Sequence, residues 1–125
     1  MIHAIKLGLQ TIPGSSIDNA PETIEHNYGE PFQYRFELEN ENGPVNLRDL
    51  TNIKLYIKAV SNDSPLYTLT VSTFTAQSCV QGFIEGTATL PRSLPPARYT
   101  YTVWITNSSG TFLVLRPSTF RILPT

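Results

Sequence analysis

The sequence predicts an all-β protein built as an antiparallel β-sandwich of seven to eight strands. Apolar and polar residues alternate along many short stretches, as they do in strands that bury one face. Turn-forming residues separate these stretches about every 8–12 positions, a spacing typical of a sandwich. Serine and threonine together number 25, and only 15% of the residues are charged, a composition that favours strands over surface helices.

The first element that we expect is a short strand near the N-terminus, where apolar residues alternate with polar or small ones over 5–9. Residues 10–31 are rich in proline, glycine, serine and asparagine, which predicts an irregular segment. A loop of that length is unusual inside a small domain. We therefore expect residues 1–23 to form an N-terminal arm that docks onto a neighbouring subunit, and residues 24–125 to form the sandwich. The apolar side chains of this arm are interface candidates: Ile2, Ile5, Leu7 and Leu9.

Within the sandwich, the clearest strand covers residues 32–39, where four apolar residues alternate with four polar ones. Similar patterns predict further strands at 53–59, 66–73, 80–90, 99–106, 111–115 and 118–123. Pro117 separates the last two, and a proline at that place indicates a sheet edge or a bend. The inward positions of these strands predict the core, to which we assign Phe32, Phe36, Leu55, Ile57, Tyr101, Val103 and Phe120.

The formal net charge is −1, so the chain has no overall basic field to hold nucleic acid or an anionic membrane. The charges are unevenly placed: residues 1–44 hold seven acidic and two basic residues, whereas residues 45–125 hold three acidic and seven basic ones. This division is compatible with ordinary surface scatter and with head-to-tail packing between copies. No apolar run approaches the length of a membrane span, and the N-terminus lacks the apolar centre of a signal peptide. We therefore expect no membrane partner and no export by a signal peptide.

The residue types offer little chemistry, and we expect no enzyme, no cofactor and no metal site. Cys79 is the one cysteine, which excludes an internal disulfide and favours a small buried apolar side chain. His26 lies near Glu25 and Glu30 in the sequence, but the spacing matches no known metal site, so we expect it to be solvated. His3 is expected at the surface or at an interface. The sequence also lacks a phosphate-binding loop, a nucleophile elbow and a calcium loop.

Trp104 is the remaining candidate, because it occupies a polar position in the alternating stretch 99–106. Three interpretations stay open for it. The indole could lie in a core that covers both faces of its strand, in a protein interface, or on a platform that stacks against a sugar ring.

Three segments stand out for their pattern: GEPFQYRFELENENGPVNLRDLTNIKLYIKA (29–59), LPPARYTYTVWI (94–105) and TFLVLRPSTFRIL (111–123). Together they resemble the immunoglobulin-like domains of tailed-phage virion proteins, especially the N-terminal domains of upper baseplate proteins. Ala97 stands where that family often has glycine. The positions that carry the resemblance are Gly43, Leu47, Ile53, Leu55, Ile57, Lys58, Tyr99, Tyr101, Thr119 and Phe120.

The resemblance implies a non-enzymatic structural protein of a tailed-bacteriophage particle, assembled in the host cytoplasm as part of the baseplate, the tail or the capsid surface. Its partners would be other virion proteins and further copies of itself, without nucleic acid or membrane. A carbohydrate-binding or host-adhesion module is the alternative, and it depends on Trp104 and other outward-facing aromatic residues. A glycan-binding screen would separate these two hypotheses.

Overall fold

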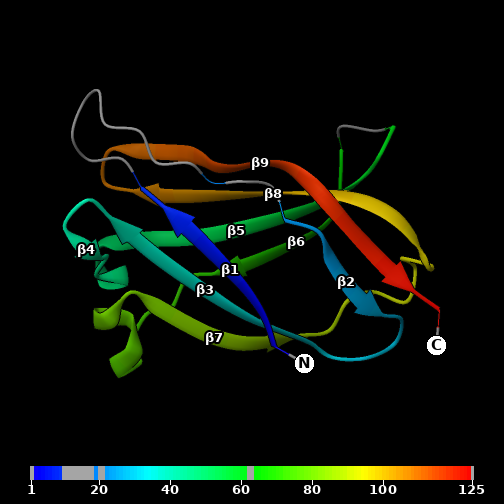
Figure 1. The fold of residues 1–125 in the computed structure, drawn as a ribbon, viewed down its shortest axis with the longest axis horizontal. Helices are drawn as coiled ribbons and strands as arrows, with labels where there is room; N and C mark the ends of the chain where they lie inside the picture. Colours follow the sequence, from blue (N-terminus) through cyan, green and yellow to red (C-terminus); the bar gives the residue numbers. More distant parts are fainter. Residues whose placement is uncertain (1, 10–18, 20–21, 62–63, 125) are drawn as a thin grey trace.

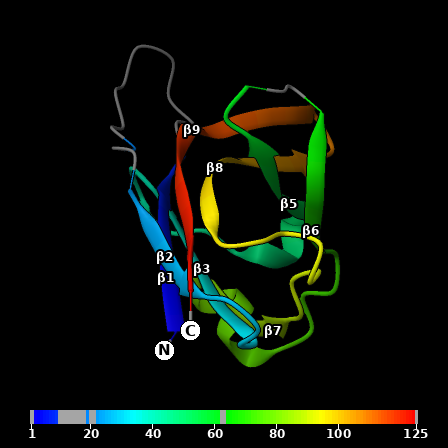
Figure 2. The same cartoon turned by 90° about the vertical axis from the view of Figure 1, so that its right-hand side faces the viewer.

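The computed structural model describes residues 2–9, 19, 22–61 and 64–124, and it confirms the all-β prediction. In these residues nine strands form two sheets, together with two short 3-10 helices and no α-helix. Figure 1 shows the sheets as two layers, and Figure 2 shows the same layers from the side.

The four-stranded sheet contains β1 (Ile2–Gly8), β3 (Phe32–Asn40), β4 (Gly43–Pro44) and β7 (Phe83–Ala88). The five-stranded sheet has the order β2 (Ile24–Asn27), β9 (Gly110–Leu123), β8 (Ala97–Asn107), β5 (Leu50–Ala59) and β6 (Pro65–Val71). The 3-10 helices are η1 (Leu47–Asp49) and η2 (Gln77–Gln81).

Two strand pairs depart from the antiparallel arrangement that the alternation predicted. Strand β1 pairs with β3 in parallel, and β2 pairs with β9 in parallel. Alternation reports that one face of a strand is buried, but it carries no information about the direction of the neighbouring strand. The connection between β1 and β2 also changes sheets, so each of these strands lies along an edge of a different layer.

Both sheets contribute to one core, and the sequence identified its centre. All seven side chains that we assigned to the core are at most 1% exposed: Phe32, Phe36, Leu55, Ile57, Tyr101, Val103 and Phe120. The rings of Phe32 and Phe120, which come from opposite sheets, lie 5.6 Å apart between centroids. Cys79 lies in η2 and is fully buried, as expected for a small apolar side chain.

Local interactions explain where several predicted strands begin and end. The strand predicted at 80–90 begins only at Phe83, because Gly82 closes η2 with a φ of +89°, a conformation that glycine adopts readily. The two C-terminal stretches instead form the single strand β9, with shifts of register around Pro117. At Pro117 the strand has no partner on its outer side among the described residues, so the predicted sheet edge is confirmed.

The corner before β8 is held by Tyr99. Its hydroxyl donates a hydrogen bond to the carbonyl of Pro95, four residues upstream, at 2.7 Å. This contact is typical of the tyrosine corner found in immunoglobulin-like sandwiches at the start of a late strand. The segment LPPARYTY therefore has a structural explanation, since the prolines shape the corner and the tyrosine fixes it to the next strand.

Candidate interaction surface

The N-terminal strand lies within its own sandwich, which corrects the prediction of an arm docked onto a neighbour. Residues 2–8 pair with β3 of the same chain along the whole of β1. Ile5 and Leu7 are 4% and 1% exposed, so neither side chain is available to a partner. The alternating apolar side chains that suggested a strand added to a neighbour pack instead into the core of their own chain. Residues 10–18, which we also placed in the arm, lie outside the described residues.

The other two interface candidates of this segment differ in exposure. Ile2 is 50% exposed, whereas Leu9 is partly buried against the core and its backbone N–H donates to the carbonyl of Glu39 at 2.7 Å. The Asn19 side chain binds both backbone groups of Gly8 and also donates to the carbonyl of Val114 on β9 at 2.8 Å. The end of β1 is therefore linked to both sheets.

Trp104 lies on the outer face of the five-stranded sheet rather than in the core. Its neighbours Val103 and Ile105 point inward and are buried, whereas Trp104 itself is half-buried. The indole N–H donates to the hydroxyl of Thr102 at 3.2 Å. Trp104 pairs laterally with Lys54 on β5 and with Leu113 on β9. Of the three interpretations of this residue, the structure removes the one in which it belongs to the core.

The edge of β9 extends this apolar area. Strand β2 pairs only with Phe120–Leu123, so residues 110–119 have no partner strand on that side among the described residues. Leu113 lies in this open part opposite Trp104 and is 44% exposed. Phe112, which is 45% exposed, lies opposite Ile105 and therefore on the other face of the strand. An open edge with exposed apolar side chains is a place where another chain can add contacts or a strand. We call Trp104 and Leu113, which share the outer face, the β8–β9 apolar strip.

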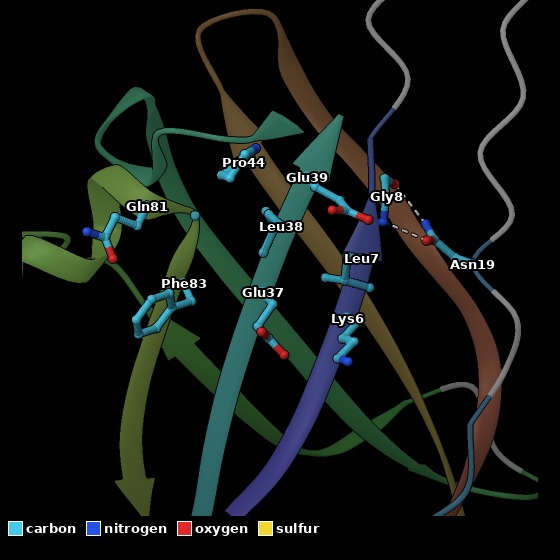
Figure 3. A pocket seen from close by; sticks show the side chains of 11 residues that line it. Lys6, Leu7, Gly8, Asn19, Glu37, Leu38, Glu39, Pro44, Gln81 and Phe83 are labelled. Atoms are coloured by element: carbon cyan, nitrogen blue, oxygen red, sulfur yellow. Dashed lines mark hydrogen bonds between the residues drawn. The ribbon is translucent and has the colours of Figure 1, made fainter. Parts of the chain in front are cut away.

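The four-stranded sheet carries an open cavity of about 380 Å³ at the end of β1. Figure 3 shows Lys6 and Glu37 on neighbouring strands, with Glu39 and Phe83 close by. Arg35 lies on β3 with Glu37 and forms ion pairs with Glu37 at 3.4 Å and with Glu85 of β7 at 2.8 Å. Its guanidinium lies 3.9 Å above the Phe83 ring. The positive charge of Arg35 is therefore compensated within the chain.

Two histidines face each other where β1 and β2 approach, although the sequence placed His26 in solvent and His3 at the surface or at an interface. His26 is 5% exposed, so the expectation that it is solvated is wrong. Its Nε2 lies 2.9 Å from the carbonyl oxygen of Glu30, and its ring lies 5.6 Å from that of His3 and 5.3 Å from Phe32. Burial and the neighbouring charge of His26 lower the pKa of His3 below its ordinary value of 6.5. The sequence could not predict this contact, because the two histidines are far apart in the chain and belong to no recognisable motif.

Two features are missing from the described residues: a cluster of metal-ligating side chains and a membrane-spanning helix. No group of three or more histidine, cysteine, aspartate or glutamate side chains gathers at metal-binding distance in the described part of the chain. In the same residues there is no helix long and apolar enough to cross a membrane.

Comparison with known proteins gave one kind of match. No protein-family model matches the sequence, and no curated protein matches it. Among solved structures, the N-terminal domain of phage TP901-1 ORF48 is similar over 98% of this chain and 97% of that chain. The two sequences are 12% identical, and the TM-score is 0.48.

Proposed function

We propose that this protein is a non-enzymatic structural subunit of a tailed-bacteriophage particle, in its baseplate, tail or capsid surface. It acts through contacts with other virion proteins and with further copies of itself. The observation that carries the proposal is the β8–β9 apolar strip, which lies beside the open edge of β9. Monomeric proteins usually protect such edges with charges, and this stretch of β9 has none before Arg116.

The segments that resemble tailed-phage domains support the same proposal, because their residues have clear structural roles here. Gly43 has a φ of +113° at the turn between β3 and β4, and Leu47 is fully buried in η1. Tyr99 forms the corner contact, and Phe120 lies in the core. These positions hold the sandwich together and leave its outer faces available for contacts.

A carbohydrate-binding module is the second candidate, and the half-buried indole of Trp104 is the observation in its favour. The lateral neighbours of Trp104, Lys54 and Leu113, offer a charge and an aliphatic group. A sugar site usually combines an aromatic platform with several convergent hydrogen-bonding groups. A protein surface suits this combination better, because interfaces pair apolar centres with a polar rim.

The composition of purified particles tests the proposal. Particles from a lysate that encodes this chain would be banded on a density gradient and analysed by quantitative mass spectrometry. We expect the chain in the particle band at a fixed copy number relative to the major virion proteins. Finding it only in the soluble fraction, while the virion proteins band normally, would refute the structural role.

A further inference from the structure

Five of the nine basic residues of this chain lie in the long strands of the five-stranded sheet. The four long strands β5, β6, β8 and β9 contain five basic residues and no acidic one, although the whole chain has a net charge of −1. Within these strands, inward and outward positions alternate, so the lysines and arginines that flank buried residues project outward. The outer face of these four strands therefore carries only positive charges, on an almost neutral protein.

The register of the strands arranges this surface in rows. Trp104 lies between Lys54 on β5 and Leu113 on β9, and Lys58 lies beside Thr100 on β8. Lys54 and Lys58 are separated by four residues, or roughly 13 Å along the strand. Arg98 pairs with Arg121 at the far end of the same face. We call this arrangement the basic face: Lys54, Lys58, Arg98 and Arg121 around the side chains of Tyr56 and Trp104.

The charges of the basic face are largely uncompensated by the described part of the chain. Arg121 forms one ion pair, with Glu25 of β2, at 3.7 Å, where both side chains are 53% exposed. Lys54, Lys58 and Arg98 form no ion pair with any described residue. This differs from the four-stranded sheet, where Arg35 is balanced by two glutamates. Like charges held close together on one face favour a partner of opposite charge.

We propose that the basic face docks an acidic protein surface, with carboxylates that meet Lys54, Lys58, Arg98 and Arg121 and an apolar side chain that packs on Trp104 and Leu113. The inference deepens the proposed function, since it names the chemistry of a virion partner. The combination of an apolar centre with charges at the rim is that of a protein interface. Nucleic acid is the less favoured occupant. Four basic side chains would release few counterions from its phosphates, and the net charge of the chain is negative.

The single tryptophan provides a direct assay of this surface. Trp104 is the one tryptophan of the chain, so its fluorescence reports on the basic face and on nothing else. The probe is a glutamate-rich peptide that contains a few leucines, titrated into the full chain at low ionic strength. We expect a saturable change in Trp104 emission, with an affinity that weakens as salt is added.

Two charge-reversal variants separate this surface from overall charge. Lys54→Glu combined with Lys58→Glu should lower the affinity for the peptide by about tenfold or more, because two of the four charges that face it are reversed. Lys6→Glu combined with Arg92→Glu makes the same change in net charge at exposed positions outside the basic face, and should leave the affinity within about twofold of the unmodified chain. Circular dichroism confirms that both variants fold.

Three results would overturn the inference: no saturation by the peptide, equal weakening in both variants, or tighter and equally face-dependent binding of a single-stranded oligodeoxynucleotide. The particle analysis is independent of this titration. If the chain is found in particles but does not bind the acidic peptide, the docking surface is refuted and the structural role stands. If the chain is absent from particles but binds the peptide through the basic face, the structural role is refuted and the docking surface stands.

Discussion

Truncation of Leu7 tests whether the N-terminal strand is part of the sandwich or an arm made for a neighbour. Leu7 is 1% exposed, and Leu7→Ala removes three buried carbon atoms. At about 0.8 kcal/mol for each buried carbon, the loss of transfer free energy is about 2.4 kcal/mol. A residual cavity adds to this cost, so we expect the free energy of unfolding to fall by about 3 kcal/mol.

Urea denaturation of the full chain, followed by circular dichroism, measures this loss. With a slope of about 2 kcal/mol/M, the midpoint should fall by about 1.5 M while the slope stays unchanged. Ile2→Ala in the same strand is the matched control, because Ile2 is 50% exposed and its truncation should cost less than about 1 kcal/mol. A Leu7→Ala protein as stable as the unmodified chain, or an equal loss from both variants, would show that β1 does not belong to this core.

Three further changes test local parts of the structure. Tyr99→Phe removes the corner hydrogen bond and should lower the free energy of unfolding by about 1 kcal/mol in urea titrations, and an unchanged midpoint would contradict the corner. Gly82→Ala should cost more than about 2 kcal/mol, because φ is +89° and the new Cβ would lie 2.7 Å from the Leu38 carbonyl oxygen; a smaller loss would refute this geometry. The lowered pKa of His3 means that the unfolded chain binds its proton first, so stability should fall as the pH drops below about 6.5 and level off below the folded-state pKa. His3→Gln should flatten that part of the pH profile, and an identical profile would exclude His3 as its source.

The sequence predicted those elements whose information lies in neighbouring residues. The alternation in β3 and β8 identified both strands and the direction of their side chains, and the buried positions of Phe36 and Val103 followed from it. Proline and glycine marked the turns because they restrict or permit particular backbone angles. These signals are local and therefore readable without knowledge of the neighbouring strands.

The elements that the sequence missed depend on distant partners. Strand β2 has only four residues and exists as a strand because β9 pairs with it, about a hundred positions away. His26 reads as a solvated residue between acidic neighbours, but the pairing places its side chain against His3 and Phe32. The basic face was hidden for the same reason. An uneven charge distribution was visible along the chain, but its concentration on one face required the order of the strands.

Lysine footprinting on intact particles tests most directly whether the protein is held in a virion through its basic face. The chain has three lysines, of which Lys54 and Lys58 lie on that face and Lys6 is exposed on the other sheet. Acetylation of gradient-purified particles and of the free chain would be compared by mass spectrometry. We predict that Lys54 and Lys58 react freely in the isolated chain and are protected in the particle, by a larger factor than Lys6. Equal reactivity of Lys54 and Lys58 in both samples, or absence of the chain from the particles, would contradict the account.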